Sequence, residues 1–205
     1  LNKRVGADFR AKEGNLSLLR KVPNATVELR SFELYAAPQS SKEGKGSLSF
    51  TADHVYFQFD IVDIFMNNYK LDKVFIQQSQ FNYTPNGKQP LITYRKGDSE
   101  NIEFDIEQMV FQDLYYTVIK PEQAFFLEGH SSRTVLNGNL GLDEFDLNVD
   151  SKLLVKKLSV DDFTYAREKE VRLRMNLLVT PGAARIKTGV CYFERIPFIT
   201  EGQFN

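Results

Sequence analysis

The stretch that decides the fold is VYFQFDI, residues 55–61, in which apolar side chains alternate with Tyr, Gln and Asp. A period of two indicates a β-strand with one buried face, because successive side chains of a strand point to opposite faces. The alternation recurs at Ile102, Phe104 and Ile106, at Phe145, Leu147 and Val149, and at Val171, Leu173, Met175, Leu177 and Val179. The sequence therefore predicts a mainly β protein.

Turn-forming residues separate these predicted strands, in segments 40–46, 85–87, 137–139 and 181–182. Gly and Asn tolerate positive φ and Pro fixes a turn, so short strands joined by such segments indicate antiparallel meanders. Helix is predicted only twice. Residues 8–22 have some helical spacing, although Gly14 weakens it and Pro23 would end it, and residues 60–69 have the spacing of one or two turns.

An internal repeat has the form apolar, any, apolar, polar, polar, apolar, any, apolar. It occurs at residues 27–34, 109–116 and 158–165, and more loosely at 74–83. The apolar phase slips by one at the paired polar residues, as it does at a β-bulge, which bends a strand. Coincidence is the alternative, because alternating strands with Asp or Asn turns are common in β proteins. Repeated bulges predict a curved, meandering antiparallel sheet with a concave apolar face.

Part of the chain resembles the N-terminal region of AsmA-like proteins. The residues that carry the resemblance are LSLLRKVPNATVEL (16–29), SLSFTADHVYFQFDI (47–61), DIF (63–65) and YKLDKVFIQ (69–77). In that family a proline-containing segment leads into a long strand, and a later strand ends in a short helical segment. The similarity covers roughly residues 15–83 and continues more weakly over 158–204, without a catalytic signature.

The resemblance implies an envelope protein of Gram-negative bacteria, anchored in the inner membrane by an N-terminal helix and extending into the periplasm. It also implies kinship with the chorein-type repeating β-groove proteins, which are thought to carry lipids between membranes and to support outer-membrane assembly. Residues 1–205 are expected to be one elongated β domain, a fragment of a longer membrane-anchored protein. The expected partners are a phospholipid or other acyl lipid and the inner membrane.

The composition restricts the function. The chain has 205 residues, with 26 Lys and Arg against 27 Asp and Glu, so bulk charge does not favour nucleic acid or another polyanion. Hydrophobic residues make up 42% of the chain, which is enough for a packed structure. Its 17 Phe and 9 Tyr, with no Trp, favour β structure. A single cysteine, Cys191, excludes an intramolecular disulfide and a Cys-rich metal cluster.

Few residues suit catalysis, so we predict no enzymatic activity, no metal and no cofactor. His54 lies where strand alternation begins and His130 lies in a predicted turn, so both are expected to be surface or loop residues. Cys191 is expected to be a small strand residue. Acidic residues cluster at 143–146 and 161–162, where solvated loop carboxylates are the simpler interpretation. The chain has no phosphate-binding Gly loop, no His-Glu-x-x-His and no Gly-x-Ser-x-Gly.

Our main hypothesis is a non-enzymatic module that binds or conducts acyl chains in a β groove. The candidate groove residues are Phe57, Phe59, Ile61, Phe104, Ile106, Leu173, Met175 and Leu177. For each of them, an ordinary core position is the competing interpretation. Exposed strand edges further predict edge-to-edge self-association, or capping by the N-terminal helix.

Two alternatives remain open. The first is a β-sandwich that binds a carbohydrate or protein, for which the aromatic pairs at 115–116 and 125–126 are candidates. The second is a small hydrolase, which requires Asp143, Glu144 or Asp146 to meet another acid or His130.

Overall fold

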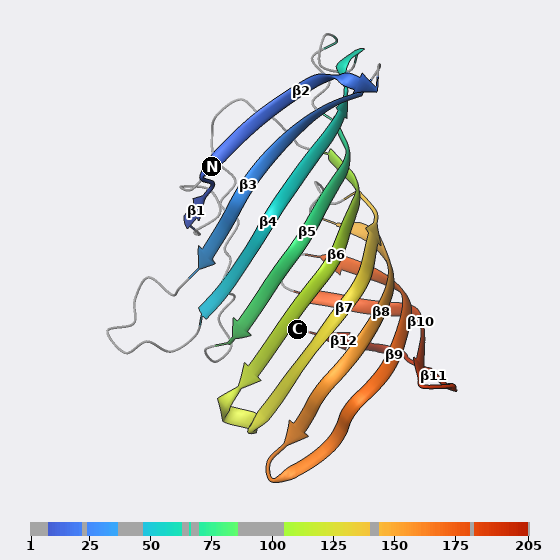
Figure 1. The fold of residues 1–205 in the computed structure, drawn as a ribbon. Helices are drawn as coiled ribbons and strands as arrows, with labels where there is room; N and C mark the ends of the chain where they lie inside the picture. Colours follow the sequence, from blue (N-terminus) through green and yellow to red (C-terminus); the bar gives the residue numbers. More distant parts are fainter. Residues whose placement is uncertain are drawn as a thin grey trace.

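The structure, a computed structural model, describes residues 8–21, 24–36, 47–62, 66, 70–85, 105–139, 144–180 and 183–204. These residues form one sheet of twelve strands (Figure 1). Ten strands follow the path β1-β3-β4-β5-β6-β7-β8-β9-β10-β11, while β2 pairs with β3 and β12 with β10. The strands are β1 (Asp8–Arg10), β2 (Glu13–Lys21), β3 (Asn24–Ala36), β4 (Ser47–Asp60), β5 (Lys70–Thr84), β6 (Asp105–Lys120), β7 (Phe125–Asn137), β8 (Phe145–Val160), β9 (Phe163–Thr180), β10 (Ala183–Phe193), β11 (Ile196–Ile199) and β12 (Gly202–Phe204).

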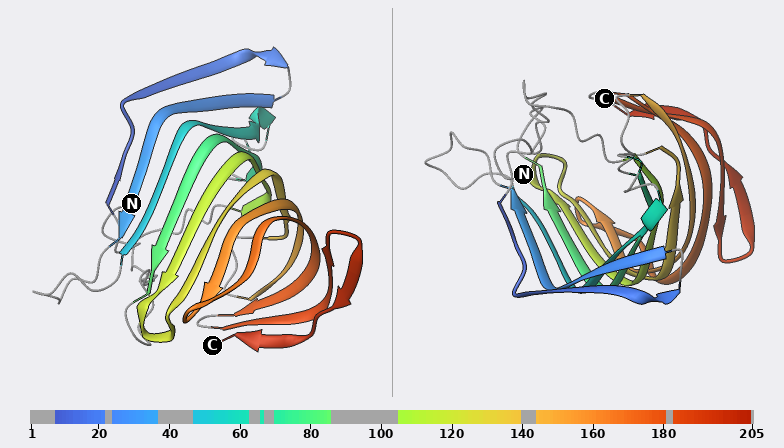
Figure 2. Two further views of the ribbon diagram at one scale, coloured as in Figure 1. Left: turned by 60° about the horizontal axis from the view of Figure 1, so that its bottom comes forward. Right: turned by 90° about the horizontal axis from the view of Figure 1, so that it is seen from above.

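The predicted mainly β fold is confirmed, and the sheet curls into an open trough (Figure 2). Strands adjacent in sequence pair antiparallel from β3 to β5 and again from β6 to β11. The exception is β5 with β6, which run parallel. The chain is therefore two antiparallel meanders that share one sheet.

A row of irregular residues crosses five neighbouring strands where the sheet bends. At the bend, the pairing skips one residue in each of β3 to β7, and these residues adjoin one another: Ser31, Asp53, Gln78, Asp113 and Ser132. Ser31, Gln78 and Asp113 have φ of 49°, 50° and 57°, which is rare for residues with a side chain. We call this line the bend row.

In three copies of the repeat, residues 27–34, 74–83 and 109–116, an irregularity lies at the polar pair as predicted, but the strands keep their register across it, so it is not the predicted extra residue of a bulge. In the fourth copy, residues 158–165, the prediction of a bulge at the polar pair is wrong, although the register shifts nearby, between Leu158 and Ser159. There Asp161, with φ 51°, lies in the hairpin turn between β8 and β9. A polar pair in which one residue has positive φ is equally compatible with an irregularity within a strand and with a tight turn. Which of the two forms depends on the strands that pair with the segment.

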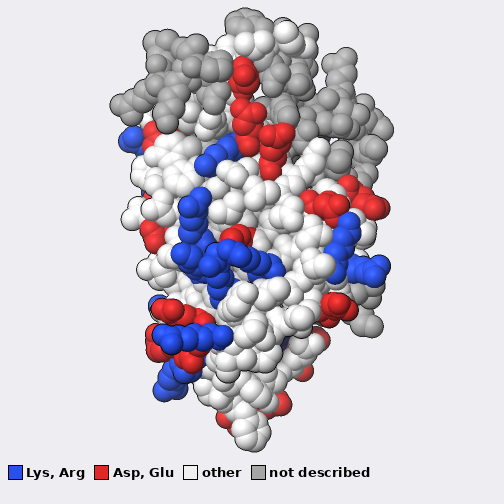
Figure 3. Space-filling model, turned by 90° about the vertical axis from the view of Figure 1, so that its right-hand side faces the viewer, with Lys and Arg blue, Asp and Glu red and all other residues white. Residues whose placement is uncertain are grey.

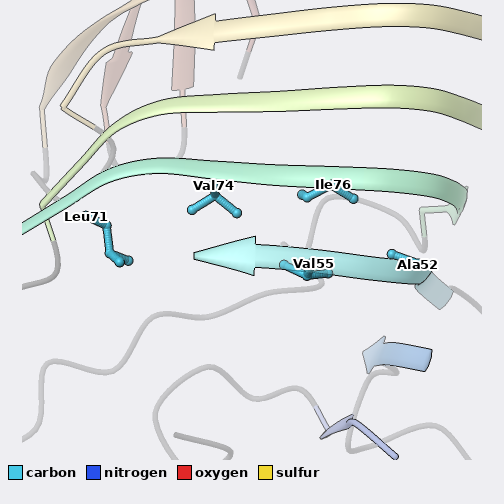
Figure 4. Close-up of a cluster of buried hydrophobic side chains, with 5 residues drawn as sticks. All are labelled: Ala52, Val55, Leu71, Val74 and Ile76. Atoms are coloured by element: carbon cyan, nitrogen blue, oxygen red, sulfur yellow. The ribbon is translucent and has the colours of Figure 1, made fainter. Parts of the chain in front are cut away.

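One face of the sheet is apolar, and we call it the inner face. Its first buried cluster consists of Ala52, Val55, Leu71, Val74 and Ile76 from β4 and β5 (Figure 4). A second consists of Val155, Ala166 and Val171 from β8 and β9. Beside the bend row this face carries small residues, Ala52, Ser79 and Ser131, which are 3%, 1% and 0% exposed. Side chains on the concave side of a bend converge, so small residues fit there, and this places the inner face on the inside of the trough.

The predicted helix over residues 8–22 is wrong, and no N-terminal helix caps the sheet within the described residues. That segment contains β1 and β2, which both pair with β3, for example Leu16 with Val27. Pairing with a strand already in the sheet satisfies the backbone and overrides a weak helical spacing that contains Gly14.

The second predicted helix is described only in part. Ile61 and Val62 begin a helical turn after β4, and the Met66 N–H donates to the Val62 carbonyl at 3.1 Å. The Asp60 carboxylate accepts the Val62 N–H at 2.8 Å, as in an N-cap. Residues 63–65 and 67–69 lie outside the described residues, as do the predicted turns at 40–46, 86–87 and 181–182. An additional 3-10 helix, Pro121–Gln123, joins β6 to β7.

Candidate functional site: the inner face of the sheet

The register places one apolar row across eight strands of the inner face. Neighbouring members are directly paired from β3 to β10, in the order Val27, Phe57, Val74, Met109, Leu136, Val149, Met175 and Gly189. We call this row the apolar ladder. With strands about 4.8 Å apart, its seven steps extend about 34 Å across the sheet. Val74 and Gly189 are buried and the other six members are only partly buried, so the ladder retains apolar surface that a ligand could contact.

The structure brings several predicted groove residues together on this face. Phe57, Phe59 and Ile106 pack against the first buried cluster, beside Met109. Phe57 belongs to the apolar ladder itself. These three side chains are half-buried, so part of each remains accessible to a ligand on the inner face.

The remaining groove candidates lie apart from that group. Leu173 packs against the second cluster, and Met175 and Leu177 follow it on the same face of β9. Ile61 lies in the helical turn that follows β4. Phe104 is outside the described residues. The candidates therefore line two parts of one surface, connected by the ladder residues Met109, Leu136 and Val149. From the sequence, Met109 is expected only as the start of a repeat copy and Val149 only as a strand residue, and Leu136 is not singled out.

A patch of hydroxyl groups interrupts the apolar surface between the two clusters. The Thr134 hydroxyl lies 2.8 Å from that of Ser131 and 2.5 Å from that of Ser151. Ser79 differs from them, because its buried hydroxyl has no hydrogen-bond partner among the described residues. The sequence does not predict this patch, because each of these residues stands at a position of its strand that faces the apolar side. Only the register between strands shows that their hydroxyl groups meet.

The Tyr116 ring occupies the space above a glycine, Gly129, on the inner face. It is paired with Gly129, and a Cβ built on Gly129 would collide with the phenol and lie 2.6 Å from the Leu154 carbonyl oxygen. Burial raises the pKa of Tyr116 to about 12. The ring therefore replaces the side chain that the glycine lacks, and the phenol stays neutral at ordinary pH.

The opposite face of the sheet, which we call the outer face, carries a row of mostly polar residues that crosses the same strands as the apolar ladder. Its paired members across the same eight strands are Arg30, His54, Gln77, Gln112, Arg133, Lys152, Arg172 and Tyr192. At one end, Glu28 accepts a hydrogen bond from Arg30 at 3.0 Å and lies 2.9 Å from His54 Nδ1. The hydrogen bond from Arg30, followed by that from His54, lowers the pKa of Glu28. A sheet that is apolar on one side and charged on the other is amphipathic across eight strands.

The two histidines are both strand residues. His54 lies inside β4, half-buried against Glu28. The prediction that His130 lies in a turn is wrong, because it lies in the middle of β7. There its ring contacts that of Tyr115 at a tilt of 32°, with ring centroids 4.5 Å apart, and its Nε2 is 3.5 Å from Asp113 Oδ1. The Gly129-His130-Ser131-Ser132 segment resembles a turn locally, but both neighbouring strands supply partners for it.

The acid constellation required by the hydrolase alternative is not assembled among the described residues. Asp146 pairs with Lys187, and Glu144 is exposed. In the register with β8, His130 is opposite Leu154, eight residues from Asp146 and thus about 26 Å along the strand. Asp143 lies outside the described residues.

Three further predictions can be compared with the structure. Cys191 is half-buried in the second cluster, and burial raises the pKa of its thiol. The described residues include no group of three His, Cys, Asp or Glu side chains suited to a metal ion. Those residues also form a single sheet, so they do not make the sandwich that the binding-module alternative requires.

Comparisons with known proteins give no family for this chain. In the parts that the structure describes, none of the helical segments has the length and hydropathy needed to cross a bilayer. No protein-family model matches the sequence, and no curated protein is significantly similar to it.

Proposed function

We propose that this chain is a lipid-binding β-groove module of an AsmA-like envelope protein, which holds acyl chains against its inner face. The observation that carries the proposal is the apolar ladder, eight directly paired positions on one face of an open sheet. Among the described residues, neither a helix nor a second sheet covers that face. An ordinary core would bury these side chains under a second layer.

The dimensions of the ladder suit an acyl chain. One leaflet of a bilayer contributes about 15 Å of hydrocarbon thickness, and the ladder is about twice that length. Its partly buried members, such as Phe57 and Met175, offer apolar area at about 25 cal/mol per Å² removed from water. A lipid tail along the trough would cover surface that is otherwise in contact with water.

The cellular setting follows from the resemblance over residues 15–83. On this proposal the module works in the periplasm, belongs to a protein anchored in the inner membrane, and supports outer-membrane biogenesis by binding or conducting phospholipid. Catalysis has no part in this function.

Native mass spectrometry of the protein purified from bacterial cells tests the proposal. We expect adducts with the mass of phospholipid that are lost in Met175→Glu, because that substitution places a charge on the inner face. Asn176→Glu is the matched control, since its side chain is on the opposite face of the same strand, where it bonds Asn148 at 2.9 Å. Absence of lipid from the wild type, or equal loss in both variants, would refute the proposal.

A further inference from the structure

A hollow with a volume of about 560 Å³ lies on the outer face over β7 to β10. Its wall includes Lys152, Arg172 and Arg174 at one end and Glu170 and Glu194 at the other, with His130 at the side of β7. Figure 3 shows this side of the molecule, where Lys and Arg side chains gather near the centre and Asp and Glu side chains surround them. The hollow is separate from the inner face, on the other side of the sheet.

Two cations of the hollow, Lys152 and Arg172, stand in line with Arg133 beside it, where the three side chains repel one another. Arg133, Lys152 and Arg172 are consecutive members of the outer polar row, directly opposite one another on three neighbouring strands. Like charges directly opposite in a sheet are destabilising. Within the described ranges, neither Arg133 nor Lys152 has an ion-pair partner, so an unneutralised cationic line crosses this end of the sheet.

The acidic groups nearby neutralise only part of this charge. Asp150 Oδ2 is 3.3 Å from Arg174 Nε and 3.8 Å from an Arg172 terminal nitrogen, so one carboxylate is shared by two guanidinium groups. Glu194 pairs with Lys169 at 2.7 Å, at the far end of the hollow. The net charge near Lys152 and Arg172 therefore remains positive.

Arg172 has hydrogen-bonding capacity that its neighbours do not use. Its Nε is buried and makes no hydrogen bond among the described residues, while the side chain as a whole is 43% exposed and lines the hollow. Guanidinium groups bind phosphate through two parallel hydrogen bonds. An oxyanion held between Lys152, Arg172 and Arg174 would neutralise these cations and relieve the repulsion along the row.

We propose that this hollow is a binding site for a phosphate-bearing ligand, with the phosphate held by Lys152, Arg172 and Arg174. This site is independent of the acyl-chain groove, and its ligand is either a soluble phosphate ester or the headgroup of a phospholipid. Glu170 and Glu194 repel a second anionic group, so the rest of the ligand is neutral or cationic where it meets them.

Isothermal titration calorimetry with sn-glycerol 3-phosphate at low ionic strength tests the site. We expect saturable binding at millimolar ligand or below, no binding of glycerol, and a loss of affinity of about tenfold or more in Arg172→Gln. Arg185→Gln is the matched control, because Arg185 is an exposed arginine on the outer face of β10 that does not line the hollow. Glu170→Gln is expected to strengthen binding, since it removes a negative charge.

Vesicles containing phosphatidic acid distinguish the two sources of phosphate. Binding to the soluble ester identifies a small-molecule site, whereas Arg172-dependent binding to vesicles alone identifies a headgroup site. Either result supports the proposal. It is overturned if neither probe binds, or if Arg172→Gln and Arg185→Gln weaken binding equally, because the attraction would then be bulk charge. Unfolding curves of both variants check that they are folded.

Discussion

Ser79 and Ser131 provide a paired test of how the bend is built, because the same substitution should have opposite effects at the two positions. Both serines are on the inner face beside the bend row, and they are 1% and 0% exposed. In the described part of the chain the Ser79 hydroxyl has no hydrogen-bond partner, whereas that of Ser131 lies 2.8 Å from Thr134 Oγ1 and 3.4 Å from Ser151 Oγ. Ser→Ala removes one oxygen in each case and leaves the backbone unchanged.

The magnitudes follow from the state of each hydroxyl. A buried polar group without a partner costs about 1–3 kcal/mol, so Ser79→Ala should raise the free energy of unfolding by about 1 kcal/mol after a small loss of packing. A satisfied hydrogen bond contributes about 1 kcal/mol, so Ser131→Ala should lower the free energy of unfolding by about that amount. In a domain of this size each change shifts Tm by about 2–4 °C.

Urea unfolding followed by far-ultraviolet circular dichroism measures both variants, since the chain has no Trp for fluorescence. The m-value should stay constant, because neither substitution changes the surface exposed on unfolding. If Ser79→Ala is destabilised as much as Ser131→Ala, the reasoning fails, because the Ser79 hydroxyl would then have a partner.

Three further predictions concern single side chains. Gly129→Ala should lower the free energy of unfolding by about 1–3 kcal/mol, measured by the same urea assay, because the new methyl group meets both the Tyr116 ring and the Leu154 carbonyl. A pH titration followed by absorbance at 295 nm should show a tyrosine that ionises near pH 12, and this signal should be absent from Tyr116→Phe. Because the pKa of Tyr116 is raised on folding, the free energy of unfolding should fall as the pH rises above 10 towards 12. Ionisation of Tyr116 near pH 10 would contradict its burial. Arg30→Gln should raise the pKa of Glu28, which can be measured by NMR of the carboxyl group. In the wild type, the lowered pKa of Glu28 contributes stability that is present above pH 4.5 and lost as the pH falls through the folded value. An unchanged pKa in the variant would show that Arg30 is not the main cause of the lowered pKa.

The sequence predicts the strands and much of their curvature, because these depend on local pattern. The alternation at residues 55–61 is found in β4, and the polar pairs ending in Ser31, Gln78 and Asp113 lie at the bend row. Where the strand continues, a slip in the phase of the apolar residues requires an irregular residue that returns them to the same face. The same pattern at 158–165 gives a turn, since whether a strand continues depends on its partners.

Features that depend on pairing between distant strands could not be predicted. Alternation is the same in parallel and antiparallel pairs, so nothing local marks the parallel pairing of β5 with β6. The hollow was missed for a related reason. Arg133, Lys152 and Arg172 are each ordinary polar positions of separate strands, and their meeting depends on register. An apolar face was predicted from the alternation, but its continuity through Leu136 was not.

The parallel junction has a consequence for the order in which the chain folds. Each meander forms by hairpins between consecutive strands, which close short loops and pair early. Because Asp105 pairs with Lys70 at the start of β5, residues 85–104 connect opposite ends of the two strands, so joining β5 to β6 closes a longer loop at a larger entropic cost. We therefore expect the two meanders to form before β5 and β6 pair, so that the trough becomes continuous in a later step. The junction is also the seam at which the halves could part without breaking a hairpin.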